Sequence, residues 1–199
     1  MTTCPSYKVV LVGDSRTGKT SLLKQCVEHQ FSTEVLPTAG LDFQWKKVFS
    51  GHEWVKLKLW DTAGEDRFRS LMPAYLQDAA AAIVVYDVTC WRSWCAARDW
   101  VNLVHHELGK ETLLAMVGNK ADLEGREVPQ DAAREESLTL GALFLETSAK
   151  TGDNVDVLFQ ELATQLPNRP RSARQAAKPE LQEEEARPSR KRCCLFPQL

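Results

Sequence analysis

Short apolar runs alternate with amphipathic segments over residues 7–166 of the chain. Apolar runs that end at turn residues are typical of buried parallel strands, whereas apolar positions repeating every three or four residues indicate helices. This pattern predicts six strands, at residues 7–12, 43–49, 54–60, 82–86, 113–117 and 143–145. It also predicts four helices, at residues 20–29, 91–108, 130–140 and 155–166, the last of them stopped by Pro167.

The second and third predicted strands are separated only by the turn sequence Ser50-Gly51-His52-Glu53, which predicts a hairpin. The other strands alternate with helices, and this order favours parallel pairing with helices on both faces. The predicted fold class is therefore α/β, with a mostly parallel six-stranded sheet and one antiparallel edge strand.

The length of 199 residues allows one domain with a full core, which we expect at residues 7–167 after a short extension at residues 1–6. Residues 168–199 are poor in apolar side chains and predict a disordered tail. The tail carries eight Lys and Arg and four Glu, so its net charge is +4. Because the whole chain has a net charge of −2, residues 1–167 have a net charge of −6. An acidic body argues against nucleic-acid binding by the folded domain.

Targeting signals are not visible near the N-terminus, and no run is long and apolar enough to span a bilayer. We therefore expect a cytosolic chain with reduced thiols. Four cysteines lack metal-ligand spacing and are interpreted as ordinary thiols: Cys4, Cys26, Cys90 and Cys95.

A glycine-rich loop between the first strand and the first helix matches the pattern G-x-x-x-x-G-K-[ST]. Backbone N–H groups and the helix N-terminus of such a loop bind phosphate oxygens. We expect Lys19 to reach the β- and γ-phosphates of a nucleotide and the Thr20 hydroxyl to bind Mg²⁺. The candidate phosphate-binding residues are Gly13, Asp14, Ser15, Arg16, Thr17, Gly18, Lys19, Thr20 and Ser21. Arg16 and Thr17 are unusual there, and we interpret both as harmless variation.

The sequence Asn119-Lys120-Ala121-Asp122 follows the fifth strand and predicts recognition of guanine. Guanine presents two adjacent donors, N1–H and N2–H₂, which match the two acceptor oxygens of the Asp122 carboxylate. We expect Asn119 to bond the base and tie the loops together, and the Lys120 stem to lie on the purine face. A second wall of the base site is expected from Ser148, Ala149 and Lys150.

Two further segments are placed to sense a third phosphate. Asp61 ends a strand, where its carboxylate can hold Mg²⁺ through a water, and Gly64 lets the backbone approach the γ-phosphate. Thr38 lies between the first helix and the hairpin, and we expect its hydroxyl to bind Mg²⁺ and its N–H to bind the γ-phosphate. Such contacts exist only with GTP, so both loops are expected to loosen after hydrolysis.

The order of these motifs, together with residues 146–150, resembles the Ras-like small GTPases, and within them the Rab branch. The strings at residues 41–43, 58–64 and 66–71 carry the Rab resemblance, which covers residues 7–166. It implies a P-loop NTPase G domain that binds GTP and GDP with Mg²⁺ and hydrolyses GTP. It also implies exchange factors, activating proteins and effectors as partners in vesicle trafficking. Effector contact is implied for Phe43, Trp60 and Tyr75, which otherwise are half-buried aromatics of strands and helices.

The sequence departs from the family at Glu65, where the resemblance implies a Gln that orients the attacking water. An ionised Glu only accepts hydrogen bonds and adds negative charge near the γ-phosphate. We expect Lys19, Gly64 and Glu65 to act in catalysis, with slow intrinsic hydrolysis and a weak response to activating proteins. The alternative is that Glu65 faces solvent or binds the water as a base, leaving a near-normal rate.

The tail joins the basic cluster Arg190-Lys191-Arg192 to the pair Cys193-Cys194. Paired cysteines resemble a Rab double prenylation site, which implies the prenylation machinery as a partner and anchoring on the cytoplasmic face of an intracellular or plasma membrane, with cycling through the cytosol. Five residues follow Cys194, more than is usual in Rabs, so unmodified thiols remain the alternative.

The function that the sequence favours most is a membrane-cycling GTPase that recruits effectors. Two other functions are also considered. A GTP-binding scaffold with negligible turnover is kept open by Glu65. A P-loop ATPase or kinase is disfavoured by Asp122 and by the lack of a substrate lid.

Overall fold

Six strands form a single sheet in the order β2-β3-β1-β4-β5-β6. The computed structural model describes residues 4–33, 38, 41–64 and 66–166. The strands are β1 (Ser6–Val12), β2 (Leu41–Phe49), β3 (Trp54–Thr62), β4 (Ala81–Asp87), β5 (Leu113–Asn119) and β6 (Leu143–Glu146). All neighbours pair in parallel except β2 and β3, which form the antiparallel hairpin at one edge.

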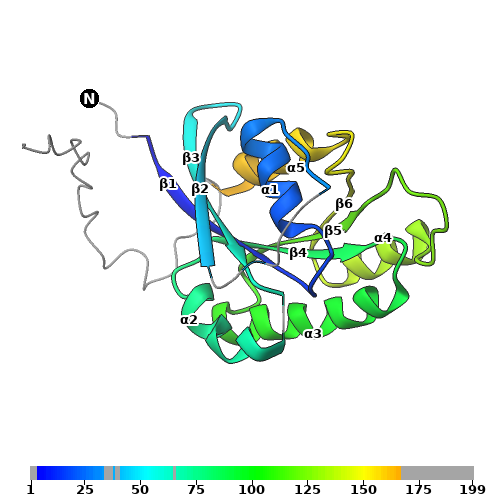
Figure 1. Cartoon of the computed structure of the whole chain (residues 1–199). Coiled ribbons are helices and arrows are strands. Elements are labelled where there is room, and N and C mark those ends of the chain that lie inside the picture. Colours follow the sequence, from blue (N-terminus) through cyan, green and yellow to red (C-terminus); the bar gives the residue numbers. More distant parts are fainter. Residues whose placement is uncertain (1–3, 34–37, 39–40, 65, 167–199) are drawn as a thin grey trace, which may run out of the picture.

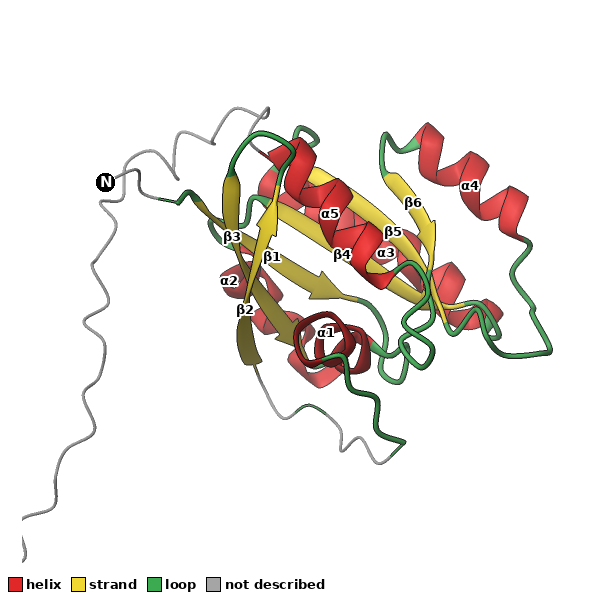
Figure 2. Ribbon diagram, turned by 90° about the horizontal axis from the view of Figure 1, so that it is seen from above, coloured by secondary structure: helices red, strands yellow, loops and turns green. Residues whose placement is uncertain are grey.

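Helices cover both faces of this sheet. They are α1 (Lys19–Glu28), α2 (Met72–Leu76), α3 (Trp91–Leu108), α4 (Gln130–Thr139) and α5 (Val155–Gln165), with a 3₁₀ helix, η1 (Asp66–Leu71), before α2. The helices α1 and α5 lie on one face, whereas α2 and α3 lie behind it (Figure 2). The connections from strand to helix run along the edge where β1, β4 and β5 end (Figure 1).

Two apolar layers hold this arrangement together, one on each side of the sheet. The strands β4 and β5 are buried at every position, which explains the apolar runs at residues 82–86 and 113–117. In β3 the burial alternates, because Val55, Leu57 and Leu59 face α1 and α5 while Lys56 and Lys58 lie on the other face. The core thus supports the carboxyl ends of the parallel strands, where ligand sites of α/β sheets form.

The predicted fold class is confirmed, and α3 spans the residues expected for it. Several strands are longer than their apolar runs, so that Asp61 lies within β3 and Asn119 within β5 rather than after it. The sequence pattern did not predict η1 and α2, which are too short to show a helical period. Within the part of the chain that the structure describes, no helix is long and apolar enough to cross a membrane. The predicted tail, residues 168–199, lies outside the described residues.

Candidate nucleotide-binding site

The loop between β1 and α1 is shaped by two glycines that no other residue can replace without strain. Gly13 has φ 140°, and a Cβ there would lie 2.2 Å from the carbonyl oxygen of Val85. Gly18 has φ 91°, and its Cβ would lie 2.3 Å from Asn119 Nδ2. The loop is therefore packed closely against β4 and β5, with the N-terminus of α1 at its end.

Lys19 is almost fully buried within this loop, at 5% exposure. Its Nζ donates hydrogen bonds to the carbonyl oxygens of Gly13 and Asp14, each at 2.8 Å. Burial lowers the pKa of Lys19 to about 8, although the negative charges of Asp61 and Asp14 partly oppose the shift. The ammonium group is thus held beside the helix N-terminus, where a bound anion such as phosphate would stabilise its charge.

Three oxygen-bearing side chains meet next to Lys19. Thr20 Oγ1 donates to Asp61 Oδ2 at 2.5 Å and lies 2.9 Å from Thr38 Oγ1, which is 3.4 Å from the same carboxylate oxygen. Burial raises the pKa of Asp61, although the Thr20 hydrogen bond and the Lys19 charge oppose the shift. Asp61 Oδ1 is buried and has no hydrogen-bond partner among the described residues. Hard oxygen ligands around a buried carboxylate suit Mg²⁺, so these residues fit the predicted metal.

The opposite end of the site is built around Asn119. Its Nδ2 donates to the Thr17 carbonyl at 2.9 Å, and its Oδ1 accepts from the Ala149 N–H at 3.1 Å and from Thr147 Oγ1 at 3.3 Å. Asn119 therefore joins the phosphate loop, β5 and the loop after β6. Close by, Asp122 Oδ1 accepts from Ser148 Oγ at 2.7 Å, and this bond fixes the orientation of the carboxylate.

Two lysines line this end of the site, and each is paired with a different carboxylate. Lys150 Nζ lies 3.8 Å from Asp122 Oδ2, and Lys120 Nζ lies 2.6 Å from Asp87 Oδ2. Although burial opposes it, hydrogen bonds from Lys120 and Thr89 lower the pKa of Asp87. The Lys120 side chain is thus anchored at its tip, which leaves its apolar stem as a wall of the site.

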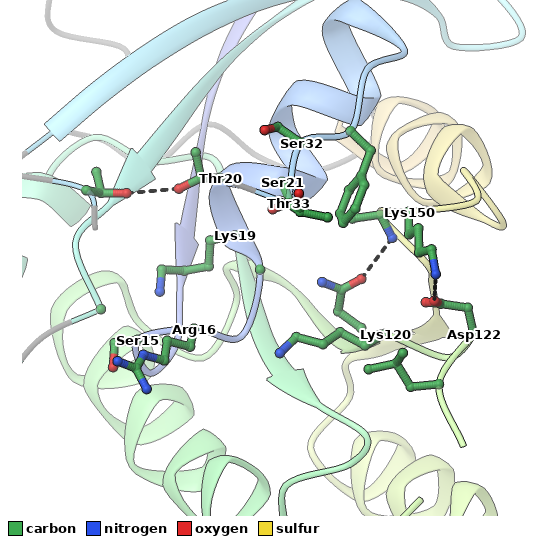
Figure 3. Close-up of a pocket in the computed structure, with 17 residues that line it drawn as sticks. Ser15, Arg16, Lys19, Thr20, Ser21, Ser32, Thr33, Lys120, Asp122 and Lys150 are labelled. Carbon is green, nitrogen blue, oxygen red and sulfur yellow. Dashed lines mark hydrogen bonds and ion pairs between the residues drawn. The ribbon is translucent and has the colours of Figure 1, made fainter. Parts of the chain in front are cut away.

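These groups surround one pocket of about 770 Å³. Figure 3 shows Lys19 and Thr20 on one side of it and Lys120, Asp122 and Lys150 on the other. The pocket is lined by Ser15, Arg16, Gly18, Lys19, Thr20, Ser21, Phe31, Ser32, Thr33, Thr38, Gly64, Asn119, Lys120, Asp122, Leu123, Ala149 and Lys150. An elongated site with a cationic, oxygen-rich end and a carboxylate end suits a nucleoside phosphate.

Five predicted nucleotide-binding residues lie behind the lining: Gly13, Asp14, Thr17, Asp61 and Ser148. Gly13, Asp14 and Thr17 support the phosphate loop, where Thr17 Oγ1 donates to the Asp14 carbonyl at 3.0 Å. Asp61 and Ser148 act through Thr20 and Asp122. Gly64, by contrast, lines the pocket, and a Cβ there would lie 2.3 Å from Lys19 Nζ.

Six residues of the site were not predicted from the sequence, among them Ser32 and Thr33 of the lining. Phe31 and Leu123 line the pocket, and Asp87 holds Lys120. Trp100 of α3 donates its indole N–H to Asp14 Oδ1 at 2.9 Å. An aromatic residue in the loop after α1 is a usable signal for Phe31, whereas Asp87 and Trp100 belong to no local motif.

A family model described as the Ras family matches residues 8–168 of the chain. The chain belongs to the Ras family. The match begins within β1 and spans the other five strands, the five α-helices and the whole pocket, so this Ras-family protein is a GTP-switched small GTPase. Ras-like GTPases bind GTP and GDP with Mg²⁺, in agreement with the oxygen ligands at Thr20, Thr38 and Asp61.

Other predicted residues of this GTPase lie away from the pocket or outside the description. Phe43 and Trp60 stack with ring centroids 5.4 Å apart on neighbouring strands. Tyr75 in α2 is half-buried against the core on the α2–α3 side. Glu65, Cys193 and Cys194 lie outside the described residues, so their predicted roles remain predictions.

Proposed function

We propose that this Ras-family protein is a Rab-type switch, which recruits effectors in vesicle trafficking when GTP is bound and hydrolyses GTP slowly. The observation that carries the proposal is the single pocket in which a phosphate end and a guanine end face one another. Lys19 and the Thr20–Asp61 pair define the first end, and Asp122 with Asn119 defines the second. Thr38 and Gly64 border the phosphate end, where they would distinguish the two nucleotide states.

The chain's residues divide the work of binding and hydrolysis between them. Lys19 and the α1 N-terminus bind the phosphates, and Thr20, Thr38 and Asp61 would hold Mg²⁺, which neutralises phosphate charge when bound. Gly64 borders the phosphate end of the pocket, where its N–H would donate to a γ-phosphate oxygen. Glu65, in place of Gln, accepts but cannot donate, so water is poorly oriented and negative charge opposes the transition state.

Effector recruitment is supported by the aromatic pair next to the two sensing segments. Phe43 is 42% exposed and stacks on Trp60, which lies two residues before Thr62 at the end of β3. Exposed aromatic side chains are efficient anchors of protein interfaces. Movement of the segments around Thr38 and Gly64 would change the surroundings of this pair, and so couple effector affinity to the bound nucleotide.

Membrane attachment is proposed from the sequence of the tail. The Arg190-Lys191-Arg192 cluster favours anionic lipid, and prenyl groups on Cys193 and Cys194 would give two-chain anchoring at the cytoplasmic face of a membrane. Exchange factors, activating proteins and the prenylation machinery are the partners that such a cycle requires. Mass spectrometry of the C-terminal peptide from the membrane fraction of cells tests the anchor, and an unmodified peptide there would exclude it.

A GTP-binding scaffold with negligible turnover is the second candidate, and Glu65 favours it. Both candidates require guanine nucleotide affinity, which is tested by competition between GTP, GDP and ATP for the purified full-length chain with Mg²⁺. We expect GTP and GDP to bind far more tightly than ATP. Equal affinity for ATP would contradict both candidates, whereas the GTP/GDP ratio on protein isolated from cells separates them.

A further inference from the structure

One face of β1, β3 and β2 is built from aromatic and lysine side chains. Cross-strand partners share a face, and on this face the partners are Phe43–Trp60, Trp45–Lys58, Lys47–Lys56 and Phe49–Trp54, with Lys8 of β1 opposite Lys58. We call these nine residues the aromatic–lysine face. The only carboxylates of the three strands, Asp42 and Asp61, are paired with each other on the opposite face.

Each lysine of this face lies over an aromatic ring. Lys58 Nζ is 4.2 Å from the ring centroid of Phe43, and Lys8 Nζ is 4.4 Å from that of Trp60. The same arrangement pairs Lys56 with Trp45 at 4.6 Å and Lys47 with Trp54 at 5.1 Å. The ammonium groups are thereby held in fixed positions, and no carboxylate of these strands neutralises them.

Five of the nine residues of the aromatic–lysine face are exposed and the other four are partly buried, whereas the reverse side of the same strands is core. Val48, Val55, Leu57 and Leu59 are buried against α1 and α5 on the reverse side. On the aromatic–lysine face Phe49 is 43% exposed and Trp54 is 52% exposed. Both lie next to the turn that joins β2 and β3, at the end of the hairpin away from α2 (Figure 1). Exposed rings in such a number mark an interaction surface rather than a packing defect.

We propose that the aromatic–lysine face binds an acidic segment of a partner protein, with carboxylates on Lys47, Lys56 and Lys58 and apolar side chains against the exposed rings. The inference rests on the proposed function, because the Phe43–Trp60 end of the face adjoins the nucleotide-sensing segments. It adds the chemistry of the partner and extends the contact along the whole hairpin to Trp54.

Charge and ring geometry favour an acidic protein segment over other polyanions. Nucleic-acid bases would have to stack on open ring faces, but the ammonium groups already lie over four rings. The chain without its tail has a net charge of −6, so a wide anionic bilayer would repel the surface around the aromatic–lysine face. An acidic peptide segment is narrow enough to cover only the aromatic–lysine face, where its carboxylates would pair with the lysine ammonium groups.

Selection of short random peptides on the full-length chain, loaded with a non-hydrolysable GTP analogue, tests the proposal. We expect the selected peptides to be acidic and to contain aromatic or aliphatic residues. The double substitution Lys56→Glu/Lys58→Glu should weaken a selected peptide by about tenfold or more, because two interfacial charge pairs become repulsive. Reversing the peptide's Glu residues to Lys should restore binding to this variant.

The matched control is Arg92→Glu/Lys110→Glu, which changes the net charge equally at exposed positions of α3 and the loop after it. Equal weakening in the control, or selection of neutral or basic peptides, would overturn the proposal. So would binding only to phosphatidylserine vesicles or oligothymidylate. If the chain binds GTP tightly but selects no acidic peptide, only this proposal is contradicted. If the chain has no affinity for guanine nucleotides, the proposed function itself is contradicted. Stoichiometric bound nucleotide shows that each variant is folded.

Discussion

The indole N–H of Trp100 donates to Asp14 Oδ1 at 2.9 Å and so joins the middle of α3 to the phosphate loop. Trp100 is 1% exposed, and the guanidinium of Arg69 lies 4.9 Å from its ring centroid. Arg69 belongs to η1, which begins two residues after Gly64. One buried indole thus contacts both the phosphate loop and the segment that follows the predicted γ-phosphate sensor.

Replacing Trp100 with Phe removes the donor but keeps an aromatic ring. We expect GDP to dissociate about fivefold faster, because a lost hydrogen bond to the partly buried Asp14 carboxylate is equivalent to roughly 1 kcal/mol in this loop. Release of a fluorescent GDP analogue measures the rate. Trp91→Phe is the matched control, since Trp91 is 49% exposed and outside the pocket. Equal rates for both variants would show that Trp100 does not position the loop.

The Asp87–Lys120 pair should make stability depend on pH in acid. The pKa of Asp87 is lowered in the fold, so its contribution is complete above the unfolded pKa near 3.9 and is lost as the pH falls through the lower folded value. We expect Asp87→Asn to lower the free energy of unfolding by about 1 kcal/mol at neutral pH. The difference should shrink below about pH 4. Urea unfolding of the two GDP-bound proteins across this range measures it, and a difference independent of pH would contradict the assignment.

The Asp122 carboxylate should determine the choice of base. In Asp122→Asn the side-chain amide donates where the carboxylate accepted, so guanine N2–H₂ loses its partner while the 2-oxo group of xanthine gains one. We expect GTP affinity to fall by roughly a hundredfold and xanthosine triphosphate to bind better than GTP. Competition between the two nucleotides measures this. Ser148→Ala removes the hydroxyl that donates to the same carboxylate and holds its orientation. This variant should bind GTP more weakly but should still prefer GTP to xanthosine triphosphate.

Much of the fold was predictable because apolar runs mark buried strands directly. The extra residues at strand ends were not, since backbone pairing continues past the last apolar side chain: Asn119 pairs with Asp87 across β5 and β4 although both are polar. The five-residue helix α2 was missed for a different reason. Pro73 lies in its first turn, where proline is tolerated, yet in a sequence proline indicates a break.

The site was predictable wherever its residues form contiguous strings. Lys19, Thr20 and Asp122 lie in such strings, and the fold brings them to one pocket. Trp100 was not, because it lies 86 residues from Asp14 and its sequence neighbours form an ordinary amphipathic helix. A single long-range contact of this kind leaves no trace in spacing or composition.

Glu65 should set the rate of GTP hydrolysis. If Glu65 acts as proposed, the amide in Glu65→Gln would supply a donor for the transition state and the substitution would remove a negative charge beside the γ-phosphate, so we expect hydrolysis to be faster by about tenfold or more. Single-turnover hydrolysis of GTP by the native chain and the variant measures the effect. Glu53→Gln, which makes the same chemical change in the exposed β2–β3 turn, is the control. Equal rates for native and Glu65→Gln protein would mean that Glu65 either faces solvent or orients water as a base, and the proposed slow turnover would then be wrong.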